Sequence, residues 1–312
     1  MTKPFLTYEQ QINKLANDKC LVIPNVQTAK EVLQNIGYFS LIGGYKHPFI
    51  NPMTRKYQNS TTFNDVLSLY IFDKQLRELT FKYLCEVEQR IRQLISYEFC
   101  KTYGESQTEY LNPNKYNKTS HNKTEIGRLI SVLDYHANKN TEHPYLVHQR
   151  KTYNNVPLWA TANALTFGQL SHFYNCLPNK IQSAIAKEYV GINESKLAAY
   201  LSVLTLFRNV CAHNERLFSF RLTTMDFPDS ILHSKLHIQQ KGVQYLQGKK
   251  DLFGLVLALR HLLPSKSFLS FKIELQKLLA AYLKRSTKIG EKSLLSMMGF
   301  PTNWKNITRY KI

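Results

Sequence analysis

Cysteine pairs, long apolar runs and acidic residues are all scarce in this 312-residue chain. The five cysteines are odd in number and widely spaced, and no CxxC pair occurs, so the sequence predicts neither a disulfide framework nor a zinc site. No apolar run approaches the roughly 18 residues of a membrane-spanning helix. The stretch MTKPFLTYEQQINKL lacks the apolar region of a signal peptide. We therefore expect a reduced, cytoplasmic protein with no membrane partner, no cofactor and no bound metal.

Basic residues outnumber the scarce acidic ones. Forty-one Lys and Arg against 22 Asp and Glu leave a net charge of +19. Because such a chain repels itself, a polyanion is its natural partner, and nucleic acid is the first candidate. From Arg260 onward, 11 Lys and Arg stand against two Glu, a net charge of +9. We expect four of these cations either to contact an RNA backbone or to form only a solvated basic face: Lys284, Arg285, Lys288 and Lys292.

Helical periodicity dominates the sequence, which predicts an all-α fold. Thr7 and Gln10 form a capping-box pattern, and Gly37 is placed to end a second helix. Residues 38–52 are expected to be a turn-rich connector, and the polar residues 104–155 a mobile basic insertion around one short helix. The remaining helical stretches are residues 63–101, 156–177, the segment from about 193, 251–263 and 267–285.

The stretch LFRNVCAHNERLF, residues 206–218, places polar groups inside an apolar helical run. One turn of helix brings Asn209 and His213 to the same face, and the flexible Arg208 side chain can extend toward them. Apolar residues on the preceding turns form a stripe that should face the core: Leu197, Leu201, Leu204 and Phe207. Such a polar group is either a satisfied structural network or a place where chemistry happens.

These residue types suit metal-free RNA cleavage. A histidine ordinarily titrates near pH 6.5 and can exchange a proton at cellular pH. An arginine presents fixed donors that match phosphate oxygens. An asparagine can orient either group. The ribose 2′-hydroxyl would attack the adjacent phosphate and leave a 2′,3′-cyclic phosphate and a 5′-hydroxyl, so DNA would not be cut.

Four stretches together resemble one known family. FRNVCAHNERL resembles the RNxxxH signature of HEPN-type ribonucleases, specifically the abortive-infection (Abi, AbiD/AbiF-like) proteins of bacterial phage defence. Three further stretches of this chain resemble segments of that family and occur in the same order. They are NIGYFSLIGGYKHPF, the long helix LYIFDKQLRELTFKYLCEVEQRIRQLISYEF, and VPLWATANALTFGQLSHFYNCL. The resemblance covers roughly residues 5–220.

This resemblance implies an all-α HEPN bundle that forms a homodimer with a composite site. Arg208 would stabilise the scissile phosphate, Asn209 would position it, and His213 would be the acid/base residue. Glu88 would pair with Arg208 or support the site, although it could equally be an exposed i,i+4 partner of Arg92. Asn214 is a further supporting candidate. Family members act as toxins held inactive until infection, some together with a small non-coding RNA.

We expect an N-terminal helical segment (1–58), a HEPN-like bundle that contains the RNxxxH motif (59–225) and a basic C-terminal helical region (226–312). His233 and His237 could bind a metal from one helix face, but no carboxylate or further ligand lies nearby in sequence. Trp159 and Trp304 are expected to be core anchors.

The leading hypothesis is a metal-independent endoribonuclease that cuts single-stranded RNA. One alternative is an RNA-binding regulatory protein without catalysis, in which the RN…H residues form a binding or structural network. Another is a helical interaction protein whose basic face binds an acidic protein partner.

Overall fold

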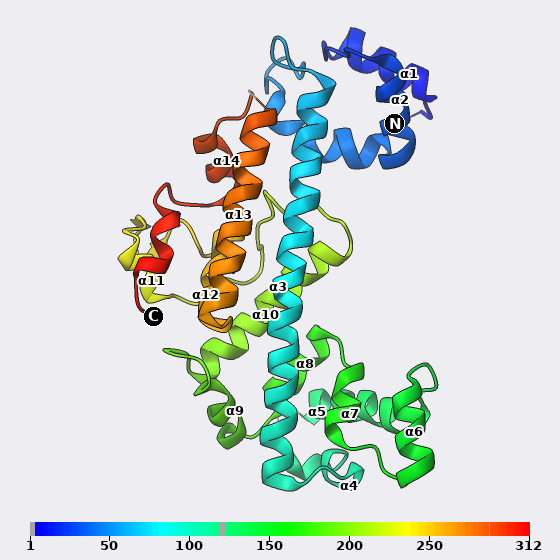
Figure 1. The fold of residues 1–312 in the computed structure, drawn as a ribbon, viewed down its shortest axis with the longest axis vertical. Helices are drawn as coiled ribbons and strands as arrows, with labels where there is room; N and C mark the ends of the chain where they lie inside the picture. Colours follow the sequence, from blue (N-terminus) through cyan, green and yellow to red (C-terminus); the bar gives the residue numbers. More distant parts are fainter. Residues whose placement is uncertain (1–3, 119–122, 287) are drawn as a thin grey trace.

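The computed structural model describes residues 4–118, 123–286 and 288–312, and helices make up nearly all of its regular structure (Figure 1). The only strands in these ranges are the two-residue β1 (Gln240–Lys241) and β2 (Gln244–Tyr245), which pair antiparallel. The all-α prediction is therefore confirmed. The α-helices are α1 (Tyr8–Asn13), α2 (Val26–Ile36), α3 (Phe63–Tyr103), α4 (Gln107–Tyr110), α5 (Lys123–Asp134), α6 (Pro144–Tyr153), α7 (Leu158–Thr161), α8 (Phe167–Cys176), α9 (Asn179–Ala186), α10 (Glu194–Ala212), α11 (Ile231–Lys235), α12 (Leu252–Leu262), α13 (Ser265–Arg285) and α14 (Glu291–Met298).

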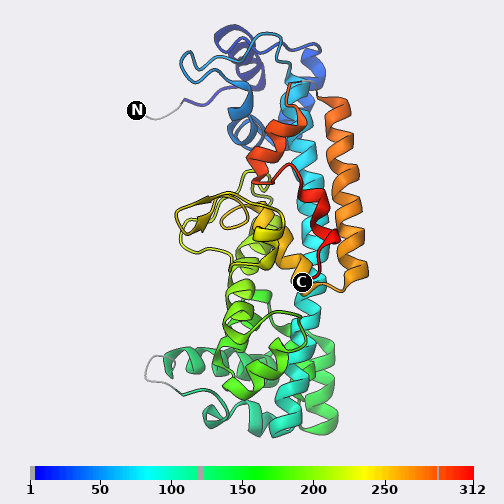
Figure 2. The same cartoon turned by 90° about the vertical axis from the view of Figure 1, so that its left-hand side faces the viewer.

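Helix α3 runs most of the length of the molecule. A capping box of Thr62 and Asp65 begins it, and Gly104, with a φ of 87°, ends it 41 residues later. At 1.5 Å per residue the helix is about 60 Å long. Helix α13 lies antiparallel beside it in both ribbon views (Figures 1 and 2). None of the described helices is both long and apolar enough to cross a membrane.

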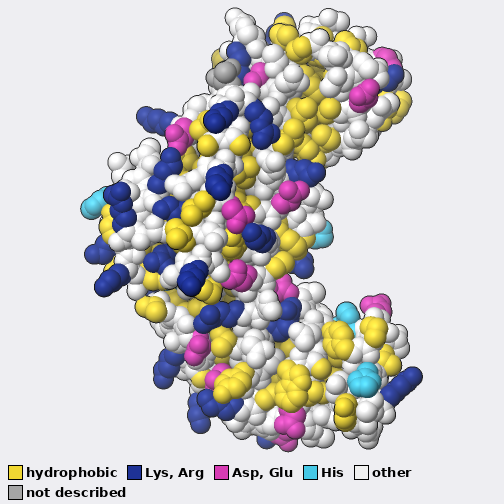
Figure 3. Space-filling model, in the orientation of Figure 1, with side chains coloured by type: hydrophobic (Ala, Val, Ile, Leu, Met, Phe, Trp, Pro, Cys, Tyr) yellow, Lys and Arg dark blue, Asp and Glu magenta, His cyan; other side chains and the backbone are white. Residues whose placement is uncertain are grey.

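Two groups of helices project from the ends of α3 toward the same side. The N-terminal helices α1 and α2 lie at its first end, and α4 to α7 lie at its other end (Figure 1). The space-filling view shows the resulting crescent, hollowed between these two groups (Figure 3). The division at residues 58 and 225 stays a prediction.

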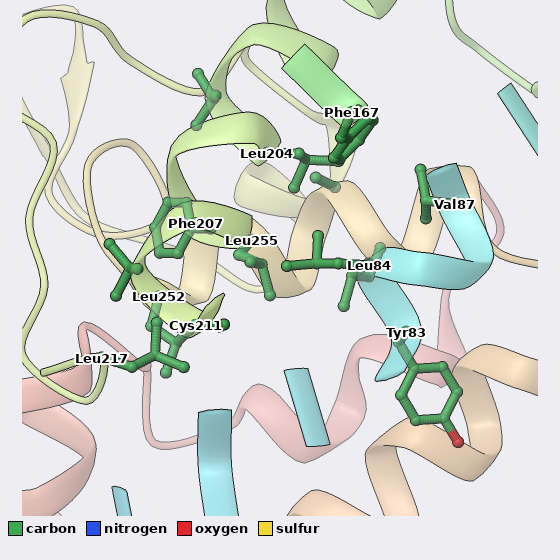
Figure 4. Close-up of a cluster of buried hydrophobic side chains, with 14 of the residues drawn as sticks. Tyr83, Leu84, Val87, Phe167, Leu204, Phe207, Cys211, Leu217, Leu252 and Leu255 are labelled. Carbon is green, nitrogen blue, oxygen red and sulfur yellow. The ribbon is translucent and has the colours of Figure 1, made fainter. Parts of the chain in front are cut away.

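Helix α10 packs its apolar stripe into the centre of the molecule. Asn193 caps its start by accepting a hydrogen bond from the Lys196 backbone N–H at 2.8 Å. Figure 4 shows Leu204 and Phe207 in one cluster with side chains from α3, α8 and α12. All four predicted stripe residues are fully buried: Leu197, Leu201, Leu204 and Phe207. The prediction of an apolar stripe is confirmed. Because this stripe faces the core, the polar residues at the end of α10 face the surface.

The expectations for two connecting segments were wrong. Between residues 104 and 155 the described part holds α4, α5 and α6 rather than one short helix. Its buried tyrosines make this polar sequence fold: Tyr110 donates a hydrogen bond to the Val156 carbonyl, and Tyr116 donates one to the Tyr110 carbonyl. Residues 38–52 also contain helical turns, a π-helical one at Phe39–Gly43 and a 3₁₀ turn at His47–Phe49.

Candidate active site at the end of α10

The helix α10 ends inside the RN…H stretch. The His213 backbone N–H donates a hydrogen bond to the Asn209 carbonyl at 2.9 Å, which closes the last turn. Asn214 follows with a φ of 56°, a left-handed conformation that asparagine tolerates better than most residues. The Glu215 N–H then donates to the Val210 carbonyl at 3.0 Å. Asn214 therefore turns the chain away from the helix at this point.

The three RN…H side chains are available to a ligand. Asn209 and His213 are exposed, and neither side chain forms a hydrogen bond with another described residue. Arg208 is half-buried, with its guanidinium 5.7 Å from the ring centre of Phe81 on α3. Its Nε is buried without a hydrogen-bond partner in the described part of the chain. Donor and acceptor groups that the fold does not use are what a bound substrate could satisfy.

The charge of Arg208 acts on Cys85 of α3. Burial and the negative charge of Glu88 raise the pKa of the Cys85 thiol, while the positive charges of Arg208 and Arg92 act in the opposite direction. The thiol therefore stays protonated at neutral pH and is a poor nucleophile.

A buried network of side chains binds the backbone of residues 215–218, just after His213. We call it the Asp73 network: the side chains of Tyr45, Asp73 and Arg77. The fully buried Asp73 carboxylate accepts hydrogen bonds from the Leu217 N–H at 3.0 Å and the Phe218 N–H at 2.7 Å. The residues that follow His213 are thus fastened to α3.

The other two members complete the Asp73 network. Arg77 donates to Asp73 at 2.8 Å and to the Glu215 carbonyl at 3.3 Å, and the Tyr45 hydroxyl donates to Asp73 at 2.7 Å. Burial raises the pKa of the Asp73 carboxyl, while Tyr45 and Arg77 act in the opposite direction. Because all four partners of Asp73 are donors, the geometry fits the carboxylate form.

The N-terminal segment also contacts the chain that follows His213 directly. Arg216 donates a hydrogen bond to the Gly44 carbonyl at 2.7 Å. Gly44 and Tyr45 are neighbours in sequence, so one short segment binds Arg216 through the Gly44 carbonyl and Asp73 through the Tyr45 hydroxyl. Neither contact was predicted, since Tyr45 lies 28 residues from Asp73 and Gly44 lies 172 residues from Arg216.

Glu88 pairs with Arg92 rather than with Arg208. The distance from its carboxylate to Arg92 is 2.7 Å, and Arg92 Nε also donates to the Ala162 carbonyl at 3.1 Å. The i,i+4 alternative is therefore present, but the prediction of an exposed pair was wrong, because only 13% of the Glu88 side chain is exposed. The pair fixes α3 to the turn after α7. Arg208 forms no ion pair with any described carboxylate.

A mixed apolar and polar groove lies along the second half of α3. Cys85, Gln89, Gln93 and Tyr97 recur every four residues and are all exposed, so they share one face of the helix. The groove holds about 830 Å³ and is lined by the last three of these residues together with Trp159 of α7. Sequence reasoning missed this groove.

Trp159 is not the expected core anchor. Its side chain is 52% exposed at the edge of the groove, whereas Trp304 is completely buried as predicted. Lys101, which also lines the groove, lies 5.7 Å from the ring centre of Tyr97. Exposed aromatic rings beside amides and a cation are suited to unpaired nucleobases.

The four C-terminal cations lie elsewhere. Lys284 and Arg285 end α13, Lys292 lies in the first turn of α14, and all four are exposed. Lys288 donates a hydrogen bond to the Asn59 carbonyl at 3.0 Å, which places the group near the N-terminal end of α3. No hydrogen bond or ion pair among the described residues links them to Arg208, Asn209 or His213.

His233 is a structural histidine. Burial lowers its pKa. Its Nδ1 accepts a hydrogen bond from the Ser230 N–H at 3.0 Å, and its Nε2 lies 3.3 Å from the Gly248 carbonyl. Both ring nitrogens face protein groups, so the alternative of a metal site with His237 is not supported. The described residues contain no cluster of three or more potential metal ligands.

The comparisons with known proteins gave one match. No curated protein and no solved structure matches the chain. A family model described as Abi-like protein matches residues 31–219. This range includes α3, the Asp73 network, the groove and all of the RN…H residues. Since the match covers more than half of the chain, the protein belongs to the Abi-like protein family.

Proposed function

We propose that the chain is a metal-independent endoribonuclease of the HEPN type, which cuts single-stranded RNA at the end of α10. His213 would transfer the proton between the 2′-hydroxyl or the leaving oxygen and solvent. Arg208 would stabilise the negative charge that develops on the phosphate, and Asn209 would hold the substrate.

One observation carries this proposal. Arg208, Asn209 and His213 form no polar contact with other described side chains, although the backbone that bears them is fixed by the helix and by the Asp73 network. Free functional groups on a rigid support are what a preorganised catalytic site requires. A purely structural network would instead pair its charged groups internally, as Asp73 does with Arg77.

Arrangement as a homodimer would complete the site. Cleavage by 2′-hydroxyl attack uses a base for the nucleophile and an acid for the leaving oxygen. One chain supplies a single exposed histidine in this stretch, and a second copy with its α10 end opposite would supply another. Two Arg208 side chains would then face the same phosphate. The exposure of Asn209 and His213 supports this arrangement.

The groove along α3 gives the substrate a place beyond the scissile bond. Unpaired bases would stack on Trp159 and Tyr97 while Gln89 and Gln93 bond to their edges. Lys284, Arg285, Lys288 and Lys292 would contact backbone phosphates of a longer RNA, and the net charge of +19 would speed the encounter.

Membership of the Abi-like family indicates a role in abortive infection. In that setting the ribonuclease would be a toxin kept inactive until phage infection, and a small non-coding RNA bound to the basic surface could restrain it. The alternative is an RNA-binding regulatory protein in which the RN…H residues grip RNA without cutting it.

The deciding experiment incubates the purified protein with labelled single-stranded RNA in EDTA. We expect cleavage with 2′,3′-cyclic phosphate ends, and we expect Arg208→Ala and His213→Ala to reduce its rate by about 10²- to 10⁴-fold. RNA binding by His213→Ala should remain near that of the unaltered protein. DNA of the same sequence should stay intact.

Matched controls are available on other helices. Arg128→Ala on α5 and His148→Ala on α6 remove the same side-chain types far in sequence from α10, and we expect both to cut at the unaltered rate. Cleavage by His213→Ala at the unaltered rate would refute the catalytic assignment. Stable RNA complexes without cleavage, in the protein and in all variants, would favour the regulatory alternative.

A further inference from the structure

A second site lies in the N-terminal segment, in a hollow of about 420 Å³ that we call the N-terminal hollow. Its walls are residues 15–19, residues 38–50 and the loop that ends at Tyr57. Hydrogen bonds join these walls: the Tyr57 N–H donates to the Lys19 carbonyl at 2.8 Å, and the Gln58 N–H donates to the Phe49 carbonyl at 2.8 Å. Its volume lies within the usual range for small-molecule sites, about 300–1,000 Å³.

The charge of the N-terminal hollow is one-sided. Lys19, Lys46, His47 and Arg55 line it, and no carboxylate does. None of these four side chains forms an ion pair with a described residue. Lys19, Lys46 and Arg55 are cations gathered around one hollow, so they repel each other, and an anion between them relieves that repulsion. Arginine and lysine donors fit phosphate oxygens in particular.

A buried hydroxyl also faces no partner there. Tyr57 is 5% exposed, and its hydroxyl has no hydrogen-bond partner among the described residues. Burial raises the pKa of this hydroxyl, so it keeps its proton. A buried donor without an acceptor is unfavourable, and a ligand oxygen that reached the hydroxyl after a small adjustment of the wall would satisfy it.

The rest of the lining is apolar and aromatic. The half-buried ring of Tyr38 and the accessible side chains of Ile50 and Pro52 supply a surface for a flat organic body, with the buried Leu15 and Ile42 behind them. An inorganic anion alone would leave this surface unused. The combination fits a phosphate attached to a planar ring.

The wall of the N-terminal hollow also touches the end of α10. Gly44 accepts the hydrogen bond of Arg216, and Tyr45 belongs to the Asp73 network. Both stand in sequence between Ile42 and Lys46, which line the hollow. A ligand held by Lys46 would therefore favour the arrangement in which Gly44 and Tyr45 are docked on the chain that follows His213.

We propose that the N-terminal hollow binds a nucleoside 5′-phosphate and that this binding stabilises the candidate active site. The binding itself is independent of the proposed function, whereas its regulatory consequence rests on it. The same phosphate chemistry could come from the 5′-phosphate end of an RNA, so the test includes both sources.

Calorimetry on the full chain with AMP, adenosine and inorganic phosphate tests the binding. We expect AMP to bind at least about tenfold more tightly than either fragment, because each uses only half of the hollow. Lys46→Glu with Arg55→Glu should weaken AMP by about 100-fold, one factor of ten for each reversed charge. Lys14→Glu with Lys74→Glu makes the same charge change outside the hollow and should leave the affinity within about twofold.

Three results would overturn the binding proposal: no heat with any probe, adenosine as tight as AMP, or equal affinity in both double variants. A 5′-phosphorylated RNA oligonucleotide that binds where AMP does not would also overturn it, and would assign the hollow to RNA ends. A 5′-hydroxyl oligonucleotide is the matched probe for that comparison.

Hydrogen exchange tests the link to the candidate site without any need for nuclease activity. We expect AMP to slow exchange of the Leu217 and Phe218 amides, which donate to Asp73, by about tenfold, and to have no such effect in the Lys46→Glu, Arg55→Glu variant. AMP bound with both amides unchanged would overturn the link. If the protein cuts no RNA, the proposed function fails, while calorimetry and exchange still decide this inference.

Discussion

Two polar clusters meet at the end of α10: the RN…H side chains, and the Asp73 network, which binds the backbone a few residues after His213. Arg77 has a side chain that is 4% exposed and a fully buried carboxylate partner in Asp73. Arg208 has no carboxylate partner among the described residues, and its neighbours Asn209 and His213 are exposed. One cluster uses its carboxylate, its hydroxyl and one guanidinium nitrogen on the fold. The other leaves its polar groups free for a ligand.

The comparison teaches how one short sequence can contain both structure and chemistry. The Asp73 network fixes the backbone at Glu215, Leu217 and Phe218, so the RN…H residues need no internal contacts to hold their position. Stability and the proposed reactivity thereby depend on different side chains, and substitutions should separate them.

The largest expected effect comes from Asp73→Ala. Removal of this carboxylate leaves Arg77 as a buried charge without its partner and leaves two backbone N–H groups unsatisfied. We expect the free energy of unfolding to fall by about 3–5 kcal/mol. Urea denaturation measures this change. Asn209→Ala, the matched change in the exposed cluster, should alter stability by no more than about 0.5 kcal/mol. Equal losses of stability in the two variants would contradict the distinction between the two clusters.

Histidines extend the comparison to pH. Burial lowers the pKa of His261 to about 4, and its Nε2 lies 2.8 Å from the Ser230 hydroxyl. An unfolded histidine titrates near pH 6.5, so the folded chain binds the proton less well. The stability that neutral His261 contributes is complete above about pH 6.5 and is lost as the pH falls toward 4, a change of about 3 kcal/mol.

The difference between the unaltered protein and His261→Gln isolates this contribution. Burial raises the pKa of Asp251 to about 6, which has the opposite effect on stability over part of the same window. Between pH 7 and pH 4 the free energy of unfolding should therefore fall by about 3 kcal/mol less in His261→Gln than in the unaltered protein, as denaturation measures. In His213→Ala, a substitution in the exposed cluster, the free energy of unfolding should change with pH as it does in the unaltered protein. Parallel curves for the unaltered protein and His261→Gln would contradict the expectation.

The two tryptophans give the smallest of these effects. Trp304 is buried and packs on Phe300, whereas Trp159 stands at the groove. In a His213→Ala background, which prevents cleavage, Trp159→Ala should weaken single-stranded RNA binding by about 1–3 kcal/mol. Fluorescence anisotropy measures the affinity. Tyr153→Ala removes another exposed aromatic side chain, outside the groove, and should have little effect. The groove assignment fails if both variants weaken binding alike.

Local signals explain what could be predicted from the sequence. The helix starts at Thr7 and Asn193 and the end at Gly37 depend on capping residues within one turn, and the structure confirms them. The exposure of Asn209 and His213 followed from the apolar stripe on the opposite side of α10. Periodicity therefore located the candidate site before any tertiary contact was known.

Long-range polar contacts could not be predicted in this way. Asp73 and Arg77 stand four residues apart on a long helix, a spacing typical of an ordinary surface ion pair. Their partners Tyr45, Leu217 and Phe218 are 28 to 145 residues away, and no local pattern identifies them. The prediction that Trp159 is a core anchor was wrong for the same reason. Its size favours burial, but its exposure depends on which surfaces α3 and α7 present to each other.

The sequence distance across the Asp73 network has a consequence for how the protein is made. The chain that follows His213 is fastened only when Asp73 meets Leu217 and Phe218, some 145 residues later. A nascent chain shorter than about 218 residues therefore cannot complete this contact while it is still on the ribosome. For a protein proposed to cut RNA, this order of folding delays activity until most of its own translation is finished.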